Sequence, residues 1–190
     1  MKKTKMPLWS VILFFCFLAF GQGVATTMLL LSLEELTAKA DVIVQCKVDS
    51  IRSEWNNDRT MIYTFVDLRP LQFMKNQVNI SGTIITLKLM GGAVGEIETV
   101  LVGSPKFQKE EEAILFIRQG HGRHFEGYME IVGLAQGKFD VIQNTVISKK
   151  IVSRNLNRIH LLKNSRTEAL KLPMQYEVFL ERIKKAIKTQ

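Results

Sequence analysis

Asp41-Val42-Ile43-Val44-Gln45-Cys46-Lys47-Val48 is the stretch that decides the fold. Its apolar positions recur with a period of two, directly after a segment with helical spacing, so a β-strand is expected to begin here. Every second side chain of a strand points to the same face, which places Val42, Val44, Cys46 and Val48 together on a buried side. Cys46 is therefore interpreted as a small buried apolar side chain, with a reactive thiol or an intermolecular disulfide as the alternative.

The same strand pattern recurs along the chain, and turn signals rich in glycine, asparagine and proline separate the segments. The expected strands are Asp41–Arg52, Met61–Met74, Thr83–Met90, Glu96–Val102, Ala113–Arg118, Tyr128–Leu134 and Lys138–Gln143. The first two are long enough to bend, as strands do at the corners of small barrels. Five to seven strands at this spacing predict a mainly β protein built on a small closed barrel of the OB type.

A short helix is expected before the barrel. Ser32 is followed three residues later by Glu35, which is the pattern of a capping box, and Leu33, Leu36 and Ala40 share one side. About two helical turns are not stable alone, so this helix is expected to plug or cap another part of the fold.

An amphipathic helix is expected at the C-terminus, over about 174–188 after Pro173. Its apolar stripe consists of Tyr176, Phe179, Leu180, Ile183 and Ile187. The sequence thus predicts a β-barrel domain over 32–145 and a basic tail over 146–190, whose helix packs on the barrel. No structure is assigned to the polar segment Ile147–Ser165.

The first 25 residues have the three parts of a signal peptide. Lys2, Lys3 and Lys5 precede the apolar run Leu8–Phe20, and small residues lead to a predicted cleavage site after Ala25. The protein is therefore expected in the periplasm or outside the cell. As an alternative, the uncharged segment Leu8–Leu31 is long enough to remain as a membrane anchor, which would leave the rest of the chain on the same side.

Composition adds few constraints. The chain has 190 residues, a formal net charge of +8 and 46% hydrophobic residues, as expected for a single exported domain with a real core. The part after Ala25 holds one cysteine, so an intramolecular disulfide is not expected. Nucleic acid is not favoured as a partner, because no stripe of aromatic and basic residues is evident.

Candidate binding residues follow from the predicted fold, because OB barrels bind ligands across one face and the adjoining loops. They are Trp55, Tyr63, Gly91, Gly92 and Gly95 of the glycine loop, and Pro105 and Phe107 of the following turn. The glycine loop lacks the Lys-Ser/Thr pair of a phosphate loop, so its glycines equally suit a turn that needs their backbone freedom.

A metal site is the alternative function, with His121, His124 and Glu126 as ligands of a metal-binding protein or a metal-dependent hydrolase. The loop is rich in glycine and no helix aligns the three side chains, so a solvated hairpin tip is the simpler interpretation. Glu110-Glu111-Glu112 is interpreted as a solvated turn. No nucleophile has an evident base partner, so no catalytic residue and no cofactor are assigned.

Seven short motifs follow one another along the chain. They are Ser32–Leu36, Ala40–Val44, Ile62–Thr64, Gly91–Gly95, Gly103–Phe107, Glu111-Glu112 before Leu115-Phe116, and Gly133–Phe139. In this order they resemble a family of exported bacterial proteins, over about Ser32 to Val141, which implies export but no particular activity. The chain departs from the family's glycines at Cys46, Asn76 and Lys109; asparagine tolerates the left-handed conformation that such a turn needs.

The layout is also similar, more distantly, to the netrin-like domain of metalloproteinase inhibitors, which is an OB-type barrel. Those inhibitors use an N-terminal cysteine and disulfides that this chain lacks after Ala25, so the similarity implies the fold and not the inhibition. The expected function is an exported, non-catalytic binding or interaction module, with another exported or envelope protein as its partner. A membrane-surface protein, held by Leu8–Leu31 or by the basic end of the C-terminal helix, is the remaining alternative.

Overall fold

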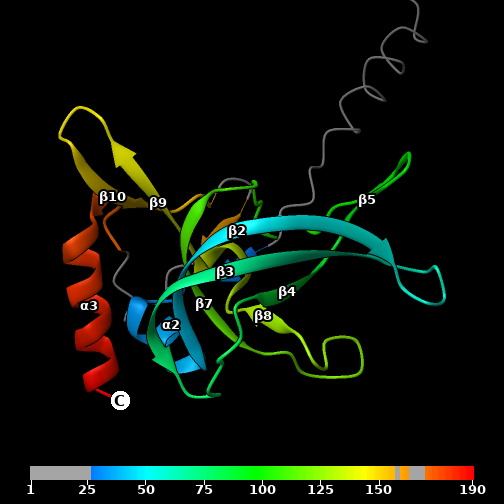
Figure 1. Cartoon of the computed structure of the whole chain (residues 1–190), viewed down its shortest axis with the longest axis horizontal. Coiled ribbons are helices and arrows are strands. Elements are labelled where there is room, and N and C mark those ends of the chain that lie inside the picture. Colours follow the sequence, from blue (N-terminus) through cyan, green and yellow to red (C-terminus); the bar gives the residue numbers. More distant parts are fainter. Residues whose placement is uncertain (1–26, 157–158, 163–169) are drawn as a thin grey trace, which may run out of the picture.

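A closed β-barrel of five strands is the centre of the computed structural model, which describes residues 27–156, 159–162 and 170–190 (Figure 1). The barrel strands are β2 (Val42–Trp55), β3 (Ile62–Asn76), β4 (Ile85–Met90), β7 (Glu112–Gln119) and β8 (Met129–Ile131). The expected mainly β fold with a short N-terminal and a C-terminal helix is confirmed. The predicted signal peptide, residues 1–25, lies outside the described residues.

The strand order identifies the barrel as OB-like. Neighbours follow the order β7-β2-β3-β4-β8, and β8 pairs with β7 to close the ring. Only β4 and β8 are parallel within the ring, with Leu87 opposite Met129, and the other pairs are antiparallel. If the five strands are numbered by their order in the chain and the ring is followed from β2, the neighbours are strands 1, 2, 3, 5 and 4. This is the Greek-key arrangement of an OB-like barrel.

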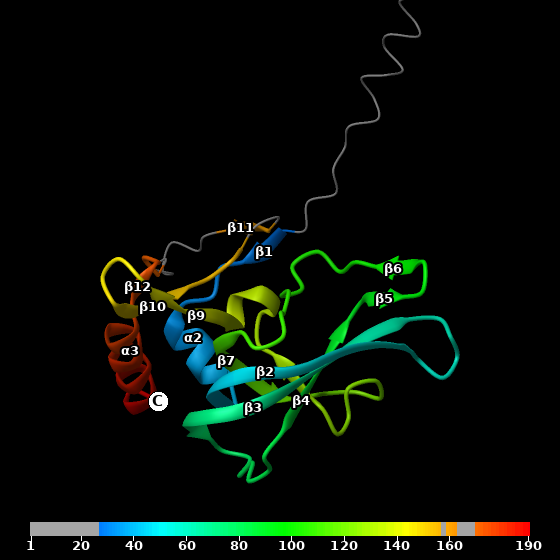
Figure 2. The ribbon, with the colours of Figure 1, turned by 45° about the horizontal axis from the view of Figure 1, so that its top comes forward.

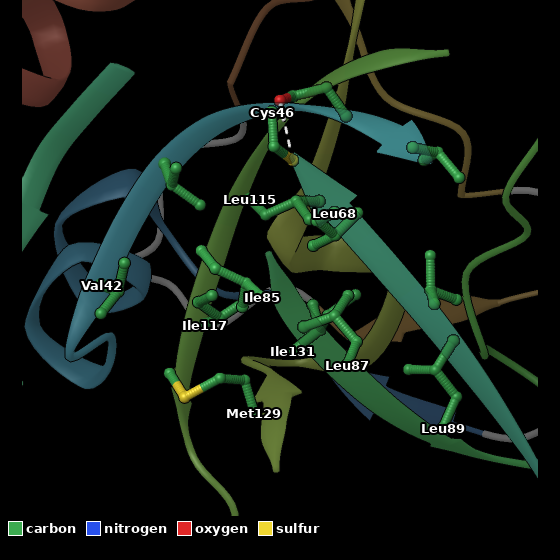
Figure 3. Packing of buried hydrophobic residues seen from close by; sticks show 14 residues of the cluster. Val42, Cys46, Leu68, Ile85, Leu87, Leu89, Leu115, Ile117, Met129 and Ile131 are labelled. Carbon is green, nitrogen blue, oxygen red and sulfur yellow. Dashed lines mark hydrogen bonds between the residues drawn. The ribbon is translucent and has the colours of Figure 1, made fainter. Parts of the chain in front are cut away.

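The barrel interior is filled by alternate side chains of these strands (Figure 3). As predicted, Val42, Val44, Cys46 and Val48 share the inner face. Cys46 is 1% exposed, and its thiol donates a hydrogen bond to the carbonyl oxygen of Ala113 at 3.6 Å. Burial raises the pKa of the Cys46 thiol to about 12, so the side chain acts as a small apolar residue.

A second core lies outside the barrel, where the outer faces of β2 and β7 meet the helices α2 (Leu33–Lys39) and α3 (Tyr176–Lys188). The strands β9 (Lys138–Asn144), β10 (Lys149–Ser153) and β12 (Met174–Gln175) continue the sheet beyond β7 on this side (Figures 1 and 2). Phe139 lies at the centre of this second core. The centre of its ring is 5.5 Å from that of Phe116 and 4.7 Å from that of Phe179. The helix α3 thus shares a core with the barrel strands.

The predicted capping box is present at the start of α2. The hydroxyl of Ser32 accepts a hydrogen bond from the Glu35 amide at 3.1 Å, and the Glu35 carboxylate accepts one from the Ser32 amide at 2.7 Å. Before this helix, β1 (Thr27–Leu29) runs parallel to β11 (His160–Leu162). The buried side chain of Gln136 fixes the segment between β1 and α2. Its Oε1 accepts a hydrogen bond from the Leu31 amide, and its Nε2 donates one to the Leu29 carbonyl. None of the helices in the described ranges is long and apolar enough to cross a bilayer.

Two expected strands differ in the structure. Within Glu96–Val102 only β6 (Ile97–Thr99) is a strand, and it pairs with β5 (Gly92–Val94) in a hairpin outside the barrel. Alternation alone could not reveal this, because the residues of β6 are exposed. The glycine loop therefore contains a strand, and the segment expected as Tyr128–Leu134 stops at Ile131, before the 3-10 helix η1 (Leu134–Gly137).

Candidate functional site

Three projections gather at one end of the molecule: the tip of the β2–β3 hairpin, the β5–β6 hairpin and the loop 120–128 (Figures 1 and 2). The loop connects β7 to β8, and the β5–β6 hairpin lies between β4 and β7 in the chain. OB barrels bind their ligands with loops and strand faces of this kind. Five of the seven candidate binding residues, all except Trp55 and Gly95, fall into two separate places near these projections.

The first place is a groove along residues 100–107, which we call the mouth groove. It consists of two hollows of about 1240 and 440 Å³ that share Val100, Leu101 and the segment Ser104–Lys106 as a wall. The smaller hollow opens over inward-facing residues of the barrel, including Val66 and Leu89. The larger one extends outward to the turn before β7 and to β9.

Four of the predicted binding residues, Gly91, Gly92, Pro105 and Phe107, line the smaller hollow. Gly92 has a positive φ of 139°, and a Cβ there would lie 2.4 Å from Oγ1 of Thr64 and 2.5 Å from Oγ of Ser53. The glycine is therefore required for the close passage of the chain over the β2–β3 pair. Gly95 lines neither hollow, and a Cβ on it would meet nothing within 4 Å.

The floor of the larger hollow is an ion-paired cluster that the sequence did not predict. Nζ of Lys138 lies 3.0 Å from Oε1 of Glu111 and also pairs with Asp140, and the ring centre of Phe107 lies 5.0 Å away. Burial raises the pKa of the Glu111 carboxyl, and the nearby Lys138 ammonium opposes this effect. The expected solvated turn Glu110-Glu111-Glu112 is thus wrong for two residues, since only Glu110 is exposed.

The neighbouring carboxylates also have cationic partners. Glu110 pairs with Lys47 at 2.6 Å, and Glu112 pairs with Lys150 at 2.8 Å. The floor therefore carries paired charges and offers little net charge to a ligand. The walls of the hollow offer backbone groups, exposed apolar side chains and a few polar side chains such as Lys106 and Gln108.

One wall of the larger hollow is a free strand edge. β9 pairs with β7 only over Lys138–Asp140, whereas it pairs with β10 over Asp140–Asn144. Its residues from Val141 to Asn144 therefore have no strand partner on the β7 side within the described part of the chain, and Val141–Gln143 line the groove. The side chain of Ile142 is 47% exposed, and Val100 and Leu101 across the groove are exposed as well. A free edge next to exposed apolar side chains is a template for pairing with another chain.

The second place is the outer face of β3 and β4 under the loop 120–128, where Tyr63 lies. Its ring is stacked with that of His124 at 6.4 Å and meets Phe125 edge-on at 6.0 Å. Tyr63 is 3% exposed, so the loop covers the ring that the sequence offered as a binding platform. Trp55, at the end of β2, is half-buried and lines neither hollow of the mouth groove.

Lys88 is the feature on this face that sequence reasoning missed. Its ammonium lies 4.3 Å from the ring centre of Tyr63, and three further rings surround it. Those ring centres are at 5.1 Å for Tyr128, 5.5 Å for Phe65 and 5.9 Å for Phe125. We call these five residues the Lys88 cluster. Tyr63 and Phe65 come from the neighbouring strand β3, whereas Phe125 and Tyr128 come from the segment between β7 and β8, a contact that no local pattern reveals.

The proposed metal ligands do not converge. His124 stacks on Tyr63, whereas Nδ1 of His121 lies 3.9 Å from Oε1 of Glu130, which already pairs with Arg118 at 2.6 Å. Within the described residues no group of three His, Cys, Asp or Glu side chains is arranged to hold a metal ion. His121, His124 and Glu126 therefore do not form a ligand set in this conformation.

A scan against protein-family models and a search of curated proteins returned no match for this chain.

Proposed function

We propose that this protein is an exported interaction module that binds an extended segment of another exported or envelope protein in the mouth groove. The free edge of β9 is the observation that carries the proposal. Export is supported by the signal-peptide pattern of residues 1–25.

Strand addition is the recognition mode that fits this edge. An extended peptide that pairs with Val141–Asn144 would add a strand to β9 on the side opposite β10, and backbone hydrogen bonds would supply much of the affinity. Each such bond contributes about 0.5–1.5 kcal/mol net, so a few of them give a weak interaction on their own.

Side-chain contacts would add specificity. Alternate residues of an extended segment point to the same side, so every second one would reach Ile142 and the exposed side chains of Val100 and Leu101. Since the charges on the floor are already paired, an apolar or neutral segment suits this groove better than a strongly charged one.

The test compares Ile142→Lys with Leu71→Lys. Both residues are exposed apolar residues on strands, 47% and 52% exposed, but Leu71 does not line the groove. A lysine on a free edge opposes strand pairing. Tagged protein would be recovered from the native envelope and medium, and co-purifying proteins would be quantified by mass spectrometry.

We expect one partner near stoichiometry with the unchanged protein and with Leu71→Lys, and at least a tenfold lower recovery with Ile142→Lys. The circular dichroism spectra of the two variants must agree. Equal recovery with both variants, or no enriched partner with the unchanged protein, would contradict the proposal.

A further inference from the structure

The cations at the loop-bearing end of the molecule differ in how their charge is compensated. Arg52 lies on the outer face of β2, with its guanidinium 4.9 Å from the ring centre of Phe65, and it pairs with Asp67 at 2.7 Å and Glu54 at 3.0 Å. Arg118 pairs with Glu130. Lys88 differs, because among the described residues its ammonium makes no hydrogen bond and no ion pair.

Four aromatic rings surround the Lys88 ammonium. Burial lowers the pKa of Lys88 from its ordinary value, while the four rings favour the charged form through their π faces. A ring face attracts a cation but accepts no strong N–H hydrogen bond, so the three donors of the ammonium remain available. Lys88 itself is half-buried and reachable from solvent.

The same cluster presents ring surfaces next to these donors. Phe125 and Tyr128 are half-buried, and the exposed His124 is stacked on Tyr63. Hydrogen bonds within the loop fix these residues, since the Tyr128 carbonyl accepts from the Gly120 amide at 2.8 Å and the Phe125 carbonyl accepts from the Tyr128 amide at 3.1 Å. Gly120 is required for this fold-back, because a Cβ there would lie 2.3 Å from the Phe125 carbonyl oxygen.

We propose that the Lys88 cluster is a binding site for an acidic sugar, whose carboxylate or sulfate group bonds to Lys88 while its ring lies on Phe125 and Tyr128. A charge-assisted hydrogen bond from the Lys88 ammonium, which has no acceptor among the described residues, to an anionic group is a strong contact. The site is separate from the mouth groove and goes beyond the proposed function. The choice of a sugar rather than a nucleic acid rests on the proposed function, because that function places the protein outside the cytoplasm. Nothing else in this inference depends on it.

Titration calorimetry with defined oligosaccharides tests the site. The probes are a sulfated heparin tetrasaccharide, a carboxylated trigalacturonate, neutral maltotetraose and a thymidine octanucleotide. The protein is compared with Lys88→Met, which keeps an apolar chain among the rings, and with Lys88→Arg, which keeps the charge. Lys149→Met removes one exposed positive charge from β10, on the far side of the barrel (Figure 1).

We expect an acidic sugar to bind and maltotetraose to bind at least tenfold more weakly. Lys88→Met should lose at least tenfold in affinity, Lys88→Arg less than threefold and Lys149→Met less than twofold, with melting temperatures showing that each variant is folded. Equal losses for Lys88→Met and Lys149→Met would show general charge attraction and overturn the proposal. Tighter binding of the octanucleotide, or no binding of either acidic sugar, would overturn it as well.

Discussion

The hydroxyl of Tyr176, the first residue of α3, donates a hydrogen bond to Oε1 of Gln45 on β2, 131 positions earlier in the chain. Gln45 is buried, and its Nε2 donates in turn to the carboxylate of Glu112 on β7. Two barrel strands and the C-terminal helix therefore share one polar network outside the barrel. A buried polar side chain is tolerated there because both ends of its amide have partners.

Replacement of Tyr176 by Phe should lower the free energy of unfolding by about 1 kcal/mol, because Oε1 of the buried Gln45 loses its donor. Urea denaturation measures the change. Tyr128→Phe is the matched control, since no hydrogen bond of the Tyr128 hydroxyl is found within the described residues, and it should change stability by less than about 0.5 kcal/mol. Equal effects of the two variants would show that the Tyr176–Gln45 bond does not stabilise the fold.

Phe179→Ala should be among the most destabilising substitutions in the chain. Phe179 is completely buried and its ring centre lies 4.7 Å from that of Phe139, so its removal leaves a cavity and should cost about 3–5 kcal/mol. Val178→Ala, one residue earlier at an exposed position, should cost less than about 0.5 kcal/mol. Thermal unfolding measures both, and a small effect of Phe179→Ala would show that α3 is not part of the folded domain.

Cys46 should resist thiol reagents in the folded protein. A chain that starts at Thr26 has Cys46 as its single thiol. Because burial raises the pKa of this thiol to about 12, Ellman's reagent at pH 8 should label it only after unfolding in denaturant. Labelling of the folded protein within seconds would contradict the buried position.

The Cys46 thiol should also make stability depend on pH. The unfolded chain loses the thiol proton near pH 9, whereas the folded chain keeps it up to about pH 12, so stability falls between these values. The slope is at most about 1.4 kcal/mol per pH unit. Cys46→Ala removes this contribution, so the stability of the unchanged protein relative to Cys46→Ala should decrease from pH 8 to pH 10. A pH-independent difference would argue against the raised pKa.

Lys138→Met should destabilise the protein in a pH-dependent way. Without the ammonium, the half-buried Glu111 loses its counter-charge, at a cost of about 2 kcal/mol at pH 7. Its carboxyl pKa, already raised by burial, should rise further above that of the unfolded chain, so the cost should shrink as the pH falls toward 4.5. Lys47→Met breaks the pair with the exposed Glu110 and should lower stability far less than Lys138→Met does at pH 7, because solvent screens an exposed ion pair. An equal cost at pH 7 and pH 5 for Lys138→Met would contradict this account.

The barrel strands were predictable because the signals that mark them, alternation of apolar residues and turn residues, lie close together in the sequence. The period of two from Val42 to Val48 fixes the inner face of the first strand, and glycine or asparagine turns mark where strands end. The same rule could not show that β5 and β6 form an exposed hairpin outside the barrel. Ile97 stands at an apolar position of the alternating pattern, as a buried residue would, but its side chain faces solvent.

The candidate sites depend on contacts that no local pattern contains. Lys138 meets Glu111 because β9 pairs with β7, and Lys88 meets Phe125 because the loop 120–128 folds back on the sheet. The sequence did indicate Pro105 and Phe107, since an OB-like fold directs attention to the loops between its strands. It could not show that the strand edge across the groove from them has no strand partner on the β7 side among the residues that the structure describes.

Photocrosslinking from the β9 edge tests the central claim most directly. A benzophenone amino acid replaces Ile142 in one variant and Leu71 in the other, and each is irradiated with the native envelope fraction. The account predicts one crosslinked partner from position 142, joined through a single extended segment, and none from position 71. Crosslinks of equal yield from both positions, or none from position 142, would contradict the claim that the mouth groove binds a partner.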